Sequence, residues 1–208
     1  MPLLKTLEIN HMCIYIWKVT ESSEELASIL REPNLLIEVT RKFKALSRQQ
    51  EYLIERILIQ QHFKNSKINL AHHPNGAPFL TNSEEHISIS HTRKYVAVAI
   101  SKESNFGIDI ETISPRVDNI LKYFMRFEEY PLSTSDNTRY HLVVWSAKES
   151  IFKSLMSGEV NTMLNYYIPP FKLSEKGKFR ASYPTAKQSF DVIYYSAEDY
   201  VLTVAQMI

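Results

Sequence analysis

The chain of 208 residues is 44% hydrophobic and 12% aromatic, which supplies enough apolar side chains for the core of one large domain or of two small lobes. Its formal net charge of +1, with no long run of one sign, excludes the basic surplus that is typical of duplex-binding proteins, so we expect no nucleic-acid partner. It has no apolar span of about 18 residues or more and no secretory pattern in residues 1–8, which predicts a cytoplasmic protein without a membrane partner.

The single cysteine, Cys13, lies in an apolar run of the sequence. One cysteine excludes an internal disulfide bond and a cysteine metal cluster, and the apolar neighbours favour a buried thiol. We therefore expect the protein to work in a reducing compartment, which agrees with the cytoplasm.

The first half of the chain begins with a strand signal followed by two helix signals. Residues His11 to Val19 are rich in β-branched and aromatic side chains, which predicts a strand. Ser22 or Ser23, followed by Glu25, is typical of a helix N-terminus. Residues Arg41 to Phe63 then place apolar side chains on one side of a long predicted helix.

The long helix also contains a second start signal, Ser47 with Gln50. After it, the Gly and Pro residues of the segment His72 to Pro78 predict a turn. Residues Ile87 to Ser90 and Tyr95 to Ile100 are then expected to pair as a hairpin.

The second half starts with another predicted strand, Phe106 to Ile110. A polar segment follows Pro115, and a helix that contains residues 145–153 comes after it. Two final strands are expected at Phe190 to Tyr195 and Tyr200 to Ala205.

The two halves follow the same order of elements, because in each a long helix leads through a loop to a closing hairpin. We therefore predict an α+β fold with two lobes related by a pseudo-twofold axis, each a long helix packed on a small antiparallel sheet. The predicted N-terminal lobe is 1–103 and the C-terminal lobe is 104–208. Interfaces between lobes favour ligand sites, so we expect the active site there.

The segment Trp145-Ser-Ala-Lys-Glu-Ser-Ile-Phe-Lys153 places charges in a helix that otherwise reads as buried. Glu149 and Lys153 lie one turn apart, whereas Lys148 falls within the apolar arc and Trp145 is expected to anchor the helix by packing. Buried charges are costly unless they are paired or bind a ligand. An internal ion pair of Glu149 with Lys153 or Lys148 and a ligand site are both compatible with this helix.

The segment Gly107-Ile-Asp-Ile-Glu111 sets Asp109 and Glu111 on one face of a strand. Such a pair is either an exposed edge with solvated acids or a site for a hard cation. With Glu149, three carboxylates make up a donor set for Mg²⁺, which keeps several waters and takes oxygens from substrate phosphates. Lys148 and Lys153 beside them indicate a phosphate ligand.

These motifs, Gly107 to Glu111 and Trp145 to Lys153, preceded by Ile89-Ser90-His91-Thr92, resemble the 4'-phosphopantetheinyl transferase superfamily. The length of the chain resembles the two-lobed, surfactin-synthetase-activating type rather than the short trimeric type, which implies a monomer. The resemblance implies that phosphopantetheine is transferred from coenzyme A to a serine of an apo carrier protein, with release of adenosine 3',5'-bisphosphate. Whether the carrier serves fatty-acid, polyketide or nonribosomal-peptide synthesis stays open.

The resemblance also implies roles for individual residues. Asp109, Glu111 and Glu149 would be the Mg²⁺ ligands, and Glu149 can also accept the serine proton. Lys153 would neutralise the departing bisphosphate. The residues implied in holding the coenzyme are Ser90, His91, Lys148, Lys153, Arg41 and Lys44. Lys148 stays undecided between a phosphate contact and an internal pair, and Glu129 matches an acidic family position near the metal.

Two positions depart from the family pattern. Ala77 stands where the family commonly has lysine, and His72 stands where it has arginine. We expect Arg41, Lys42, Lys44 or Arg93 to replace these cationic contacts. A Mg²⁺-dependent phosphodiesterase and a non-catalytic relative that binds coenzyme or carrier are the alternative functions. The segment Tyr123 to Tyr130 is either an apolar ridge for the carrier or a helix that packs on its own lobe.

Overall fold

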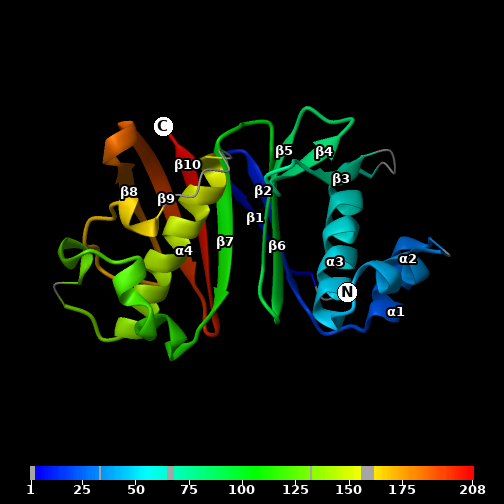
Figure 1. Cartoon of the computed structure of the whole chain (residues 1–208), viewed down its shortest axis with the longest axis horizontal. Coiled ribbons are helices and arrows are strands. Elements are labelled where there is room, and N and C mark those ends of the chain that lie inside the picture. The colour runs from blue at the N-terminus through cyan, green and yellow to red at the C-terminus, as the bar shows by residue number, and fades with distance from the viewer. Residues whose placement is uncertain (1–2, 33, 65–67, 132, 156–161) are drawn as a thin grey trace. The chain divides into compact units, whose positions relative to one another are not determined.

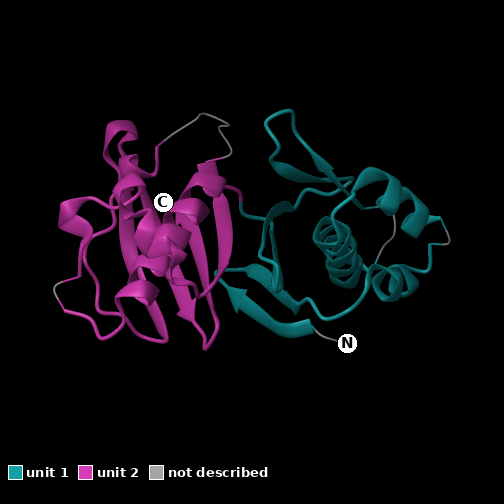
Figure 2. Cartoon of the chain, turned by 60° about the horizontal axis from the view of Figure 1, so that its bottom comes forward, with its two compact units in different colours: residues 1–103 teal, residues 104–208 magenta. Residues whose placement is uncertain are grey.

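The computed structural model describes residues 3–32, 34–64, 68–131, 133–155 and 162–208, and it has the predicted α+β class. The chain divides into two compact units, residues 1–103 and 104–208 (Figure 2). Each unit combines a four-stranded antiparallel sheet with one long helix (Figure 1). Within the described ranges, no helix is long and apolar enough to cross a membrane.

Unit 1 contains a sheet with the strand order β1-β2-β6-β5 and a separate hairpin of β3 and β4. The central strand β6 alternates small and β-branched side chains and is buried over its whole length. Neighbouring strands of this sheet are antiparallel, and β6 pairs with β2 on one side and with β5 on the other. The strands are β1 (Leu3–Ile9), β2 (Met12–Lys18), β3 (Asn69–His72), β4 (Pro78–Thr81), β5 (His86–His91) and β6 (Tyr95–Ser101).

The helices of unit 1 are α1 (Ser23–Leu30), α2 (Leu35–Lys42) and α3 (Leu46–Phe63). Helix α1 begins as predicted, because the side chain of Ser22 accepts from the Glu25 N–H group and Glu25 caps Ser22 in return.

The predicted helix from residue 41 to residue 63 is in fact two helices. The backbone is extended at Phe43 and Ala45, and the Phe43 ring lies 5.3 Å from the ring of Tyr52. At the break, the carbonyl oxygen of Phe43 accepts a hydrogen bond from the side chain of Gln49 at 2.9 Å. Helix α3 therefore starts close to the second start signal at Ser47, and its buried side chains, such as Leu53 and Leu58, join the core of unit 1.

Unit 2 has the strand order β7-β10-β9-β8, and all neighbouring strands are antiparallel. Strands β7 (Phe106–Thr112), β9 (Gln188–Ser196) and β10 (Tyr200–Met207) include the predicted ones, whereas β8 (Lys176–Tyr183) was not predicted. Helix α4 (Asn137–Leu155) packs its apolar side against the sheet, and its residues share one core with those of β9 and β10 (Figure 1).

Between β7 and α4 the chain forms three short 3₁₀ segments, η1 (Pro115–Asn119), η2 (Leu121–Tyr123) and η3 (Phe127–Glu129). The carboxylate of Asp118 accepts from the Thr138 hydroxyl at 2.6 Å and pairs with the His141 Nδ1 atom at 2.6 Å. These contacts attach the segment to the first turns of α4.

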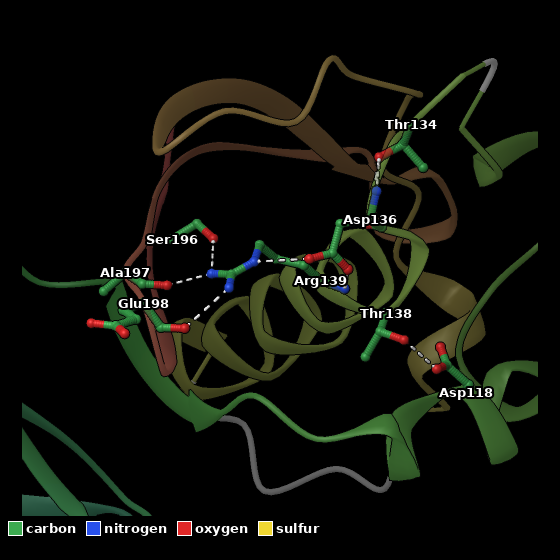
Figure 3. Close-up of polar contacts among 8 residues, drawn as sticks. All are labelled: Asp118, Thr134, Asp136, Thr138, Arg139, Ser196, Ala197 and Glu198. Carbon is green, nitrogen blue, oxygen red and sulfur yellow. Dashed lines mark hydrogen bonds and ion pairs between the residues drawn. The ribbon is translucent and has the colours of Figure 1, made fainter.

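The beginning of α4 is also tied to the turn between β9 and β10 by Arg139 (Figure 3). Its guanidinium group donates to the carboxylate of Asp136, to the Ser196 hydroxyl at 2.9 Å, and to the backbone carbonyls of Ala197 and Glu198. The first turns of α4 are thus attached both to the 3₁₀ segment η1 and to the turn between β9 and β10.

Candidate active site

Strand β7 and helix α4 approach each other closely at Gly107. A Cβ atom on Gly107 would lie 2.1 Å from the carbonyl oxygen of Ser150 and 2.7 Å from the backbone nitrogen of Ser154. A glycine at this position therefore allows the helix backbone to pack directly on the strand. The charged side chains of α4 then come within reach of the carboxylates on β7.

Two side chains of α4 contact the two acids of β7. The Lys153 Nζ atom donates to Asp109 Oδ1 at 2.8 Å, and Asp109 itself is 4% exposed. The indole Nε1 atom of Trp145 donates to Glu111 Oε1 at 3.0 Å. Trp145, which we expected only to pack, thus also holds one of the candidate ligands, because its indole has a polar edge as well as an apolar body.

The three acids influence one another electrostatically. Burial, followed by the negative charge of Asp109, raises the pKa of Glu111 to about 7, although the Trp145 hydrogen bond and Lys153 act in the opposite direction. Burial also raises the pKa of Glu149, with the negative charge of Asp109 as the second cause and Lys153 opposing both. The carboxylates of Asp109, Glu111 and Glu149 therefore repel one another when ionised.

The donor chemistry of these three residues fits a hard divalent cation, because carboxylate oxygens that repel each other are stabilised by such an ion. In this structure, Lys153 donates a hydrogen bond to one oxygen of Asp109, and Trp145 donates one to an oxygen of Glu111. Within the described ranges, no three His, Cys, Asp or Glu side chains are grouped closely enough to hold a metal ion. The three residues fit such an ion by their chemistry, and in this structure the side chains of Asp109 and Glu111 contact Lys153 and Trp145 instead.

Lys148 has an internal partner that the sequence analysis did not name. Its side chain is 0% exposed, and its Nζ atom donates to Glu129 Oε2 at 2.8 Å and to the carbonyl oxygen of Phe124 at 2.6 Å. The carboxylate of Glu129 is equally buried and also accepts from the backbone N–H groups of Arg126 and Ile168. Of the two alternatives for Lys148, the structure therefore shows the internal pair, formed with Glu129 instead of Glu149.

Because of this pair, Glu129 does not lie where the family resemblance implied, which was near the metal. The carboxylate is fully buried and accepts hydrogen bonds from Lys148 and from two backbone N–H groups rather than joining the acids of β7. The same contacts hold the segment from Phe124 to Glu129 against α4. The side chains of Tyr123 and Phe127 remain outside, with 60% and 88% of their surface exposed.

In unit 1, Ser90 and His91 lie at the end of β5, where Ser90 is buried and His91 is partly exposed. His91 contacts Arg48 through a 2.8 Å hydrogen bond, and Arg48 forms an ion pair of 2.7 Å with Glu51. These three residues belong to the lining of a cavity of about 470 Å³ that lies within unit 1.

The cations predicted for coenzyme binding only partly coincide with this cavity. Lys42 lines it, whereas Arg41 and Lys44 are exposed and do not belong to its lining. The sequence analysis missed Arg48 and Arg56, which do line it. Their signal was available, because Arg48, Tyr52 and Arg56 are spaced by four residues and share one face of α3.

A comparison with protein families assigns residues 105–205 to the model of the 4'-phosphopantetheinyl transferase superfamily. The matched range includes β7 and α4, and hence all three acids, both lysines and Glu129. The resemblance that the two motifs indicated is thereby confirmed. A search of curated proteins found no match to this chain.

Proposed function

We propose that this protein, whose residues 105–205 belong to the 4'-phosphopantetheinyl transferase superfamily, transfers 4'-phosphopantetheine from coenzyme A to a serine hydroxyl of an apo carrier protein. The superfamily acts in phosphopantetheine transfer and uses coenzyme A and carrier proteins as substrates. The observation that supports the specific reaction is the contact between Lys153 and Asp109, which sets a cation beside three mutually repelling carboxylates. We further propose that the protein acts as a cytoplasmic monomer.

Asp109, Glu111 and Glu149 would hold Mg²⁺, which when bound withdraws negative charge from the diphosphate oxygens of the coenzyme. The hydroxyl oxygen of the carrier serine bonds to the phosphorus that carries the pantetheine arm, and Glu149 accepts the proton of this hydroxyl group. The bond from this phosphorus to the oxygen of the departing adenosine 3',5'-bisphosphate breaks. Lys153, which is 27% exposed, turns from Asp109 to the leaving phosphate and neutralises it.

Lys148 has no contact with substrate in this proposal. Its pairing with Glu129 holds the segment from Phe124 to Glu129 against the helix that carries Glu149. Ser90 and His91 hold coenzyme phosphates, and the exposed Arg41 and Lys44 attract the anionic coenzyme at longer range.

The experiment is incubation with coenzyme A, Mg²⁺ and a panel of apo carrier proteins, followed by intact mass spectrometry. We expect at least one carrier to gain one phosphopantetheine, and Glu149→Gln and Lys153→Ala to reduce the rate by about 100-fold or more. Lys178→Ala is the matched control, because this lysine pairs with Asp191 on the exposed surface of β8 and β9. Its rate should equal that of the wild type.

Two results would contradict the proposal. One is the absence of any modified carrier at saturating coenzyme A. The other is release of the bisphosphate at an equal rate without a carrier, which identifies water as the acceptor and the protein as a phosphodiesterase. Binding of a carrier without transfer identifies the non-catalytic alternative.

A further inference from the structure

Two buried hydroxyl groups join α4 to the strands β7 and β10, and the catalytic proposal gives them no role. The Ser146 hydroxyl donates to the backbone carbonyl oxygen of Asp109 at 3.4 Å, and the Oγ atom of Ser146 lies 2.9 Å from Oγ1 of Thr203. Because the hydrogen of Ser146 is directed at Asp109, the Thr203 hydroxyl is the donor in the second bond. Both side chains are 0% exposed. One residue of α4 is thus hydrogen-bonded to two neighbouring strands.

The strands themselves bring the partners of Ser146 together. Asp109 of β7 and Thr203 of β10 lie directly opposite each other in the antiparallel register. On β10, Thr203 shares a face with Val201 and Ala205, which both belong to the apolar core of unit 2. Ser146 therefore meets a hydroxyl group in a row of β10 that is otherwise apolar.

This pair of hydroxyl groups is not required for packing. Valine has nearly the shape of threonine, and replacing both partners of a buried hydrogen bond by apolar groups of the same shape is nearly neutral for stability. Removing only one partner instead leaves a buried polar group unsatisfied. Hydrogen bonds are directional, whereas apolar contacts are not. The pair therefore contributes mainly a fixed orientation of α4 on the sheet.

The orientation is fixed at the part of α4 that carries the candidate catalytic residues. Ser146 precedes Glu149 by three positions, so both lie within one helical turn. Further along the helix, Lys153 donates to the carboxylate of Asp109 at 2.8 Å. The helix thus contacts Asp109 at its backbone through Ser146 and at its side chain through Lys153. The close approach at Gly107 limits the distance between α4 and β7, and the hydroxyl pair limits the rotation of the helix about that point.

We propose that Ser146 and Thr203 are positioning residues, which hold α4 and β7 in the relative position from which Asp109 and Glu149 bind a divalent cation. The inference rests on the proposed function, because that function uses these acids as metal ligands. Neither hydroxyl group touches the cation or a substrate, since both are buried and hydrogen-bonded within the protein. Loss of a contact that supports metal ligands typically lowers metal affinity by about 10- to 100-fold.

The first test is binding of Mn²⁺ alone, followed by electron paramagnetic resonance of the free ion. Mn²⁺ prefers oxygen ligands as Mg²⁺ does, and the measurement involves neither coenzyme nor turnover. Ser146→Ala should raise the Kd about tenfold. Ser154→Ala is the matched control, because this equally buried hydroxyl donates within α4, to the carbonyl oxygen of Ile151, and its variant should bind as the wild type does. Equal affinities of Ser146→Ala and wild type would overturn the inference.

The double variant Ser146→Ala with Thr203→Val separates orientation from stability. Ser146→Ala alone leaves the Thr203 hydroxyl buried without its acceptor and should lower the midpoint of urea unfolding. The double variant removes both hydroxyl groups and should recover the midpoint of the wild type. Its affinity for Mn²⁺ should nevertheless stay about tenfold weaker, because the directional contact is still absent. Recovery of metal affinity together with stability would show a purely structural role and overturn the inference.

Thr203→Ser is the conservative variant. It keeps the hydroxyl group and removes only a methyl group, so it should bind Mn²⁺ as the wild type does even if its unfolding midpoint falls. A loss of affinity as large as that of Ser146→Ala would assign the effect to packing instead of the hydrogen bond and contradict the role of Thr203.

The transfer assay supplies the last test. At Mg²⁺ concentrations below the wild-type Kd, Ser146→Ala should transfer about tenfold more slowly, and saturating Mg²⁺ should restore most of the rate. A defect that Mg²⁺ does not relieve would place the effect elsewhere and overturn the inference. A wild-type protein that binds no Mn²⁺ and modifies no carrier would overturn the proposed function as well, whereas an active wild type beside an equally active Ser146→Ala would overturn this inference alone.

Discussion

Two lysines of α4, five positions apart, form ion pairs of the same length in very different surroundings. The Lys148 Nζ atom lies 2.8 Å from Glu129, and both side chains are 0% exposed. The Lys153 Nζ atom also lies 2.8 Å from its partner, Asp109, but 27% of the lysine side chain is exposed. Distance alone therefore does not separate a fully buried ion pair from a partly exposed one.

The difference lies in what else each carboxylate contacts. Both oxygens of Glu129 accept hydrogen bonds, from Lys148 and from two backbone N–H groups, and the fully buried side chain is closed to a ligand from solvent. Asp109 instead shares its surroundings with Glu111 and Glu149, whose pKa values its charge raises. The pair of Lys148 with Glu129 is sealed from solvent and stabilises the fold. The pair of Lys153 with Asp109 is open to solvent on the lysine side and lies beside repelling carboxylates, so its lysine can be exchanged for a ligand.

The largest effect is expected from breaking the sealed pair. Lys148→Met should lower the free energy of unfolding by about 3–5 kcal/mol, because it leaves the Glu129 carboxylate buried without a counter-charge. Urea unfolding of wild type and variant measures the change.

The double variant Lys148→Met with Glu129→Gln is the control for this result. It removes both charges and keeps an acceptor oxygen for one of the two backbone N–H groups, of Arg126 or of Ile168, so it should recover part of the loss. A single variant that loses less than about 1 kcal/mol would show that the pair is not a stabilising element of the unit.

The next largest effect is expected at Gly107, where the close approach of α4 to β7 brings Lys153 within reach of Asp109. Gly107→Ala should lower the free energy of unfolding by about 1–3 kcal/mol, because its Cβ atom would lie 2.1 Å from the Ser150 carbonyl oxygen. Displacement of α4 should also lengthen the contact between Lys153 and Asp109 and reduce the transfer rate.

Gly177→Ala offers the matched comparison for this variant. Its added Cβ would overlap the outer atoms of the Tyr194 ring, the nearest at 2.3 Å, so a side chain rather than backbone would have to shift. It should leave the transfer rate unchanged, and an equal loss of rate in both variants would contradict the role given to Gly107.

The sequence predicts best what local periodicity determines. The alternation in Gly107 to Glu111 predicts both the strand and the common face of Asp109 and Glu111, and the pair Ser22 and Glu25 predicts the cap of α1. Strand β8 was missed because it is an outer strand whose polar and glycine positions weaken the signal.

Contacts between distant segments could not be predicted in the same way. Glu129 lies 19 positions from Lys148, and only the packing of the 3₁₀ segments on α4 brings them together. The motif likewise predicts the packing of Trp145 but not the direction of its indole N–H group, which depends on β7. The sites proposed for Mg²⁺ and coenzyme A stay predictions that the experiments above test.

A smaller effect is expected from removing the open lysine. Lys153→Met should lower the free energy of unfolding by about 2 kcal/mol near pH 8 and by less near pH 5. The raised pKa of Glu111 means that the stability linked to this group is present below about pH 4.5 and is lost as the pH rises through about 7. Lys153 opposes this shift, so its removal enlarges the loss at high pH.

Unfolding curves at both pH values for Lys153→Met and for the exposed Lys178→Met measure this difference. The exposed variant should lose less than about 1 kcal/mol at either pH. An effect of Lys153→Met that does not depend on pH would show that the lysine does not stabilise the ionised acids.

The smallest effect, about 1 kcal/mol, is expected from Trp145→Phe, which removes the hydrogen bond to Glu111. The ring contact with Phe124, 5.2 Å between centres, can persist in the variant. Because the hydrogen bond lowers the pKa of Glu111, its loss destabilises only the ionised carboxylate, and the cost should grow as the pH rises through about 7. Trp17→Phe is the matched control, since its indole donates to Glu21 in unit 1, away from the acids of β7. Its cost should be constant over this range, and equal pH dependence of the two variants would show that Trp145 supports Glu111 by packing alone.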